Sequence, residues 1–351
     1  MEYYSSRISM HGSIVHSSLK TFFMSVCAII GLFIGFFIIL LVLNVIQSAE
    51  STPTSYYELE VRPNANGVRK VLSKNAPVVL KLNIDGMIGG ESLNSRSVNE
   101  ILVESRENTL KGDRVKAILL AINSPGGTVN DADGIYRAIL NYKKQHNVPV
   151  YAYVDGLCAS GGMYIASAAD KIYSTDTSLI GSVGVLTGPF VNASALMEKI
   201  GLSALTLSAG IGKDDLNPLR PWVKGEEKPL QSIVDYYYEY FVAIVTKART
   251  SLSKEKLMAE YGAKIFPAAQ AKEYGFIDVV GASYESTLSE LVAAIDIDDD
   301  YYQVVELTKS AWASLFHTET SLLFGKIKHV FNLPIECDPI FQNPYLYLYK
   351  P

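Results

Sequence analysis

VPVYAYVDGLCASGGMYIASAADKIYSTDTSLIGSVGV, residues 148–185, is the stretch around which the chain is organised. It begins with a β-branched and aromatic run, 148–154, that is typical of a buried strand, and Asp155 and Gly156 end that run. Ser160 and two glycines then open an apolar, alanine-rich segment that we expect to be helical. Ser160 is therefore predicted on a strand-to-helix turn, beside the unpaired N–H groups of a helix N-terminus. This setting suits either a nucleophilic serine with an oxyanion site or a serine that only caps the helix.

A second unit of the same kind lies just upstream. The run VKAILLAI at 115–122 predicts a buried strand, NSPGG follows at 123–127, and apolar residues then recur at helical spacing. Right-handed crossovers would bring both glycine turns to one edge of a parallel sheet, so N–H groups of Gly126 or Gly127 could face Ser160 as oxyanion donors. The alternatives are a plain turn or a phosphate-binding loop. NSPGG lacks both the Lys-Ser/Thr pair of a P-loop and the GxGxxG spacing.

These motifs, with GSVGV at 181–185 and a lysine at 213, resemble the signal peptide peptidase A family of membrane-anchored serine/lysine peptidases. The resemblance spans roughly residues 78–281. It implies an α/β fold of the Clp-protease/crotonase type, built from repeated ββα units. Only one NSPGG and one ASGG occur, which indicates a form with a single peptidase repeat. Met163 stands where the family usually has tyrosine, a change that conserves size.

The resemblance also implies the site residues. Ser160 would be the nucleophile and Lys213 the general base, and Ser182 matches a family serine that hydrogen-bonds the lysine amine. The oxyanion donors would be Gly126 or Gly127 together with Gly161.

Only the family match selects the base, because the residues alone cannot separate Lys213 from Lys171, Lys199 or Lys224. A Ser/His/Asp triad is poorly supported, since His146 is the one histidine near the domain centre. It is expected at the end of the helix before the 148–154 strand, opposite to the sheet edge that carries Ser160. A lysine that acts as a base at neutral pH needs a pKa about three units below the usual 10.4. An apolar site closed to water could supply that change.

Composition excludes several classes of function. The net charge of −5 and the pI near 5.6 give no polyelectrolyte pattern, so we expect no nucleic-acid partner. Cys27, Cys158 and Cys337 are too few and too scattered for a disulfide framework or a zinc site. The acidic run 296–300 lacks the EF-hand spacing, which leaves calcium as a weak alternative to a solvated turn. We expect no metal and no cofactor.

The segment 22–46 is apolar except for Ser25 and Asn44, and it is long enough to cross a bilayer as a helix. The alternative is a buried core helix, but such helices rarely stay apolar on every face. Basic residues precede the segment, which favours an N-terminus inside. The expected organisation is a cytoplasmic segment (1–21), a transmembrane anchor (22–46), a linker (47–76), a serine/lysine peptidase domain (77–281) and a C-terminal extension (282–351).

Other elements are expected from periodicity. An apolar stripe predicts a helix over 229–248 that packs on the core or on another subunit, and 205–207 is expected to be a short strand. In the extension we expect helices over 288–294 and 310–331 and a strand over 301–307, with subunit contacts as one role. A single repeat with an exposed aromatic face predicts a ring-like homo-oligomer.

We therefore expect a serine endopeptidase of the signal peptide peptidase type that degrades cleaved signal peptides and other hydrophobic peptides through an acyl-enzyme. It would be a single-pass protein of the bacterial inner (cytoplasmic) membrane with its catalytic domain on the extracytoplasmic side. The alternatives are a crotonase-like acyl-CoA hydratase or hydrolase, which needs no nucleophilic serine, and an inactive membrane scaffold of the same fold.

Overall fold

The computed structural model describes residues 5–50, 57–107, 110–297, 301–309 and 346–348. It contains two compact units, residues 1–55 and residues 56–351, and each is described by itself.

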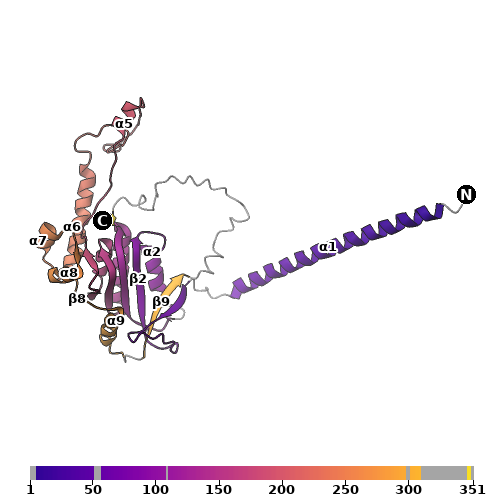
Figure 1. The fold of residues 1–351 in the computed structure, drawn as a ribbon, viewed down its shortest axis with the longest axis horizontal. Coiled ribbons are helices and arrows are strands. Elements are labelled where there is room, and N and C mark those ends of the chain that lie inside the picture. The colour runs from indigo at the N-terminus through magenta and orange to yellow at the C-terminus, as the bar shows by residue number, and fades with distance from the viewer. Residues whose placement is uncertain (1–4, 51–56, 108–109, 298–300, 310–345, 349–351) are drawn as a thin grey trace. The chain divides into compact units, whose positions relative to one another are not determined.

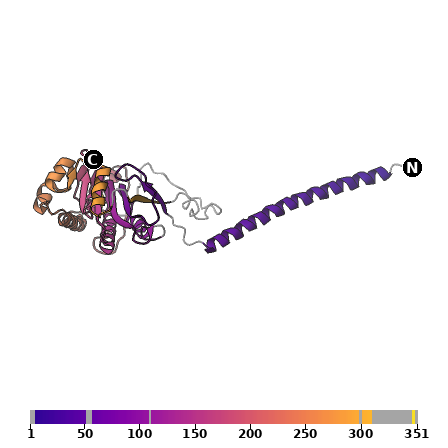
Figure 2. The same cartoon turned by 90° about the horizontal axis from the view of Figure 1, so that it is seen from below.

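The first unit is one helix, α1 (Ser5–Glu50), which is continuous in both views (Figure 1, Figure 2). Its stretch His16–Leu41 is long and apolar enough to cross a membrane by length and composition. No side chain in that stretch is buried within the protein. The expected apolar helix is therefore present, and it extends beyond 22–46 at both ends.

The second unit is organised around a mixed, mostly parallel sheet. Its main strands lie in the order β1-β9-β2-β3-β4-β5-β8, and β6 continues beside β4. All neighbours on the path are parallel except β1, which runs antiparallel to β9. The strands are β1 (Tyr57–Arg62), β2 (Val78–Ile88), β3 (Val115–Thr128), β4 (Val150–Ala159), β5 (Lys171–Ser174), β6 (Leu179–Gly181), β7 (Ile265–Pro267), β8 (Val279–Val280), β9 (Gln303–Lys309) and β10 (Leu346–Leu348).

Helices cover both faces of this sheet because alternate strand residues point to opposite sides. Leu80 and Leu82 of β2 belong to a core cluster with buried residues of α2, α3, α4 and α6, whereas Val79 packs in a second cluster with α9. The helices are α2 (Ser95–Glu104), α3 (Val129–His146), α4 (Gly161–Ala166), α5 (Ser194–Lys199), α6 (Lys228–Ala248), α7 (Lys254–Lys256), a π-helical turn (Leu257–Tyr261), α8 (Ala268–Tyr274) and α9 (Tyr284–Ala293).

Three features differ from the sequence expectations. NSPGG is not a turn, because β3 continues through it to Thr128. Residues 205–207 form no strand and are exposed. The sheet also extends beyond 77–281, since β1 and β9 pair with each other at its edge. The predicted helix over 310–331 lies outside the described residues.

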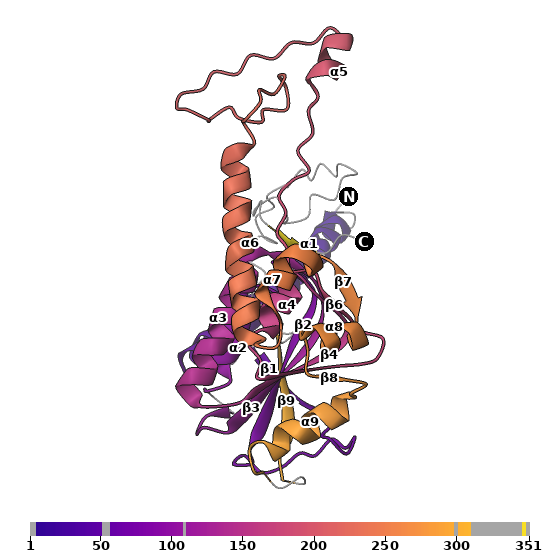
Figure 3. The same ribbon diagram turned by 90° about the vertical axis from the view of Figure 1, so that its left-hand side faces the viewer.

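The segment 184–240, which we call the arm, contains no buried residue. It comprises α5, long irregular stretches and the first part of α6, and it projects from one end of the sheet (Figure 3). Only the second part of α6 is buried, through Phe241, Val242, Ile244 and Val245. The predicted stripe on α6 is therefore a core stripe that is fully buried over the second part of the helix, and Tyr237, Tyr238 and Tyr240 just before it are partly buried against the same core.

Candidate active site

Ser160 lies between the end of β4 and the start of α4, as the sequence predicts. Its backbone has φ 54° and ψ −116°, a conformation that costs a non-glycine residue free energy. The side chain is fully buried, and its hydroxyl has no hydrogen-bond partner in the described part of the chain. The hydroxyl also makes no capping bond to α4. The backbone alone starts the helix, with Tyr164 N–H donating to the Ser160 carbonyl at 2.9 Å. Helix capping therefore does not explain this serine.

The two glycine motifs meet beside Ser160. A β carbon added at Gly161 would lie 3.2 Å from the Cα atom of Gly126 and 3.2 Å from the nitrogen of Gly127. The N–H of Gly126 already donates to the hydroxyl of Ser124 at 3.1 Å. That same hydroxyl donates to the Gly86 carbonyl at 2.6 Å, so Ser124 fixes the end of β3 against β2. The sequence analysis missed this role of Ser124, although the residue lies within the NSPGG motif.

Ser182 occupies the corresponding position on the neighbouring strand. Ala159 of β4 pairs with Gly181 of β6, so Ser160 and Ser182 each follow one member of a pair. Ser160 N–H donates to the Gly181 carbonyl at 2.9 Å, and Ser182 also has a positive φ of 56°. The structure thus brings Ser160, Ser182 and the three glycines together at one end of the sheet.

Lys213 lies apart from this group. It is exposed on the arm, in a turn with positive φ at Gly210 and Gly212. No salt bridge involves Lys213 in the described part of the chain, and Asp214 pairs with Arg220 instead. Within one chain, then, the serine and the lysine are not in contact. Arg220 is a second residue that the sequence analysis did not single out.

A cavity of about 380 Å³ begins at Ser182. Val183 and Val185 line it from the segment after β6, and Val234 and Tyr238 line it from α6. Gln231 and Asp235 add polar groups from the same helix. The space next to Ser182 can therefore take an apolar side chain. Among the described residues, no group of three or more His, Cys, Asp or Glu side chains could hold a metal ion.

Strand β10 lies against the same end of β3. It runs antiparallel, with Leu346 opposite Thr128, Tyr347 opposite Gly127 and Leu348 opposite Gly126. The backbone of the glycine motif is thus an edge to which an extended peptide segment can pair.

Comparison with known proteins identifies the family and the fold. The family model "Peptidase family S49" matches residues 142–295, and the model "Clp protease" matches residues 92–180. The expected Clp-protease type of α/β fold is thereby confirmed. Among solved structures, a point mutant of ClpP1 from Listeria monocytogenes is 20% identical with a TM-score of 0.39, covering 61% of this chain and 96% of that one.

The curated relatives are also named as peptidases. The chain is 31% identical over 214 residues to "Putative signal peptide peptidase SppA" of Enterococcus faecium, covering 59% of this chain and 61% of that protein. It is 36% identical over 215 residues to "Putative protease MJ0651" of Methanocaldococcus jannaschii, covering 61% of this chain and 67% of that protein. The matches thus span about two thirds of these relatives. The resemblance to signal peptide peptidase A is confirmed, and the chain belongs to peptidase family S49.

Proposed function

We propose that this protein is a serine endopeptidase that cleaves hydrophobic peptides through an acyl-enzyme on Ser160. The observation that carries the proposal is the Ser160 hydroxyl, which is buried on a strained strand-to-helix turn without a partner in the described part of the chain. A buried hydroxyl normally has a hydrogen-bond partner, and an exception in a native protein needs an explanation, of which a catalytic role is one. Membership of a peptidase family supports the same reading.

The proposed chemistry uses Lys213 as general base. The Ser160 oxygen adds to the scissile carbonyl carbon while the hydroxyl proton passes to the lysine amine. The tetrahedral intermediate collapses, the C–N bond breaks, and the lysine returns the proton to the leaving amine. Water then adds to the ester, losing a proton to the same lysine, and the acid product leaves as the proton returns to the serine oxygen.

Two backbone N–H groups would hold the oxyanion. Gly161 follows the nucleophile directly, and the nitrogen of Gly127 lies close to it across the strand end. The N–H of Gly126 is engaged by Ser124, which favours Gly127 over Gly126 as the second donor. Ser182, directly after the adjacent strand β6, would orient the lysine amine.

Lys213 must then come from outside the chain's own site. We propose that the arm of a second copy delivers it in a homo-oligomer. The arm carries exposed apolar side chains that need cover, among them Leu205, Leu207 and Ile211. Because Lys213 lies on the same arm, covering these side chains would also bring the lysine to a neighbouring serine.

The proposed substrates are cleaved signal peptides and similar apolar segments. The cavity beside Ser182 supports this, since its valines and tyrosine can contact aliphatic side chains. The name of the Enterococcus faecium relative supports it as well. We further propose that α1 anchors the protein in a membrane with the peptidase unit on the extracytoplasmic side. Resistance of the full chain to carbonate extraction from membranes, lost on deletion of residues 1–50, would test the anchor.

The decisive experiment combines labelling with a base substitution. A fluorophosphonate probe should label the wild type at Ser160, and mass spectrometry should find no label on Ser160→Ala. Lys213→Arg keeps a positive charge but cannot accept the proton, so we expect it to lose ~10² or more in kcat/KM. Lys199→Arg and Lys224→Arg are the matched controls and should stay near wild type. A folded Lys213→Arg protein with more than about a tenth of wild-type kcat/KM would remove the base from the mechanism.

A further inference from the structure

The turn that carries Lys213 has no hydrophobic core to hold it. No residue of the arm is buried, and the side chain of Ile211 is fully exposed. Within the turn, Lys213 N–H donates to the Gly210 carbonyl at 3.3 Å, and Asp215 N–H donates to the Gly212 carbonyl at 3.2 Å. Both bonds are long, and two glycines make the backbone permissive. The shape of this turn must therefore depend on side-chain contacts.

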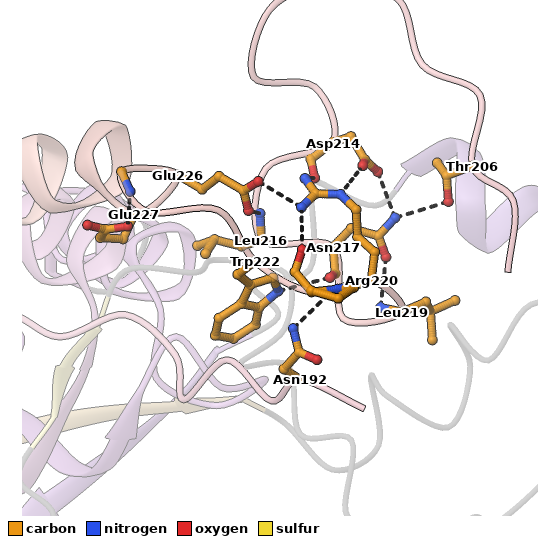
Figure 4. A network of polar contacts seen from close by, with 12 residues as sticks. Asn192, Thr206, Asp214, Leu216, Asn217, Leu219, Arg220, Trp222, Glu226 and Glu227 are labelled. Carbon is orange, nitrogen blue, oxygen red and sulfur yellow. Dashed lines mark hydrogen bonds and ion pairs between the residues drawn. The ribbon is translucent and has the colours of Figure 1, made fainter. Parts of the chain in front are cut away.

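Arg220 supplies those contacts (Figure 4). Its Nε donates to the Asp214 carboxylate at 2.5 Å, and its Nη2 donates to the Asp214 carbonyl. Its Nη1 pairs with Glu226 at 2.7 Å and also donates to the Pro221 carbonyl at 3.0 Å. The planar guanidinium thus binds both the side chain and the backbone of the residue next to Lys213.

The same network holds the residues that follow. The second oxygen of Glu226 accepts from Leu216 N–H at 3.0 Å, and Asn217 donates to Asp214 at 2.6 Å and to Thr206 at 3.0 Å. Asp214 and Leu216 are thereby tied to one frame. The hydrogen bond from Arg220, followed by that from Asn217, lowers the pKa of the Asp214 carboxyl, so the carboxylate keeps its charge further into the acid range.

We propose that Arg220 is the positioning residue for Lys213: it fixes the backbone of residues 214–216 and so presents the lysine amine in one direction. This inference rests on the proposed function, in which Lys213 is the base. A base must lie within hydrogen-bond reach of the proton it takes, and a misplacement of about 1 Å can cost ~10² in rate. Lysine could not replace Arg220, because a single ammonium cannot reach the same acceptors with fixed geometry.

The test is a double-mutant cycle in the full-length protein in detergent, with a fluorogenic apolar peptide and an activated peptide ester as substrates. Arg220→Ala should lower kcat about 10- to 100-fold with KM nearly unchanged, and Arg220→Lys should recover little of it. In a Lys213→Ala background, Arg220→Ala should change the residual ester hydrolysis by less than about twofold, because residues that act as a unit are not additive. Lys199→Ala removes a similar charge from the arm, away from the network, and should behave as wild type.

Other outcomes would overturn the inference. If Arg220→Ala keeps more than half of kcat, or lowers activity equally with and without Lys213, Arg220 does not act through the lysine. If Lys213→Ala itself is fully active, the base proposal fails, and the positioning role fails with it. If Lys213→Ala is inactive while Arg220→Ala is active, only the positioning role fails. Should Arg220→Ala not fold, Asp214→Asn probes the same contact and should lower kcat by at least about threefold in the wild-type background alone.

Discussion

Gly127 is a glycine because no side chain fits at its position. A β carbon there would lie 1.8 Å from the carbonyl oxygen of Ile88. Backbone atoms cannot yield as a side chain can, so the approach of β3 to β2 requires hydrogen at this place. The residue that we propose as an oxyanion donor is thus also fixed by packing.

Gly127→Ala should lower the free energy of unfolding by at least about 2 kcal/mol, because β2 and β3 must separate locally. Thermal unfolding of the detergent-solubilised protein, followed by circular dichroism, measures this. Gly90→Ala is the matched control, since its β carbon would meet nothing closer than the Met87 carbonyl at 3.5 Å. Equal melting temperatures for the two variants would contradict the packing argument.

Cys158, two residues before the nucleophile, is fully buried, and burial raises the pKa of its thiol to about 12. The thiol therefore stays neutral in the folded protein at neutral pH and is not a second nucleophile. Iodoacetamide at pH 8 should leave Cys158 unmodified in the folded protein and alkylate it after unfolding in guanidinium. Cys158→Ala should keep kcat/KM within about threefold of wild type. Fast alkylation of the folded protein at Cys158 would refute this.

The raised pKa also makes stability depend on pH. Because the Cys158 thiol ionises at a lower pH in the unfolded chain than in the folded protein, its contribution to the free energy of unfolding is full below about pH 9. That contribution falls as the pH rises towards 12.

The site residues differ in how far the sequence could predict them. The placement of Ser160 beside Gly126 or Gly127 follows from two consecutive strand units, because parallel strands carry their ends to the same edge. Gly161 as a donor comes from the family resemblance. The ion pair of Asp214 with Arg220 could not be predicted in this way. No hydrophobic period in the sequence indicates that the chain folds back to place Arg220 beside Asp214.

At the scale of elements, α3 begins directly behind the glycine motif. Thr128 caps this helix by accepting from Asp131 N–H at 3.3 Å, and its hydroxyl donates to the Asp131 carboxylate at 2.6 Å. The other oxygen of that carboxylate accepts from Ser95 N–H at 2.8 Å, at the start of α2. One cap thus joins the starts of two helices to the end of β3.

Thr128→Ala should therefore cost about 1 kcal/mol of stability, the usual value for a lost cap, while Thr128→Ser should keep most of it. Urea unfolding of the two variants with a common m-value would measure the difference. If both variants match the wild type, the cap does not contribute. A loss in Thr128→Ser as large as in Thr128→Ala would instead assign the effect to the missing methyl group.

The elements also differ in predictability. The strands at 148–154 and 115–122 could be predicted from continuous apolar runs, and the helix at 229–248 from its hydrophobic period. The pairing of β1 with β9 was not, since Tyr57 lies opposite Lys309 and strands so far apart in sequence leave no local signal. β3 runs through NSPGG because its neighbours pair with it there, which outweighs the turn preference of Pro and Gly.

At the scale of the molecule, the arm predicts association. Leu205 and Leu207 are 85% and 87% exposed, more than a monomer in water would favour for neighbouring leucines. We expect the mass of the detergent-solubilised protein by light scattering at micromolar concentration to be a multiple of the 38.5 kDa chain. Leu205→Glu with Leu207→Glu should reduce both mass and activity. Val71→Glu changes a similarly exposed side chain outside the arm and should alter neither. A monomeric wild type with full activity would contradict this account.

Strand β10 has a further consequence, because it occupies the edge of β3 to which an extended substrate could pair. A substrate that pairs in extended form with Gly126, Gly127 and Thr128 has to displace residues 346–348 first. Because β10 belongs to the same chain, this competition does not depend on protein concentration. If β10 occupies the edge of β3 for about nine tenths of the time, it raises the apparent KM of the substrate about tenfold and leaves kcat unchanged. Deleting residues 344–351 should therefore lower KM, and a synthetic peptide of residues 343–351 should inhibit the shortened protein competitively. An unchanged KM would mean that substrates bind elsewhere. A lowered KM would mean that β10 weakens the binding of every peptide that pairs with this edge, so that at a low peptide concentration mainly the strongest edge binders are cut.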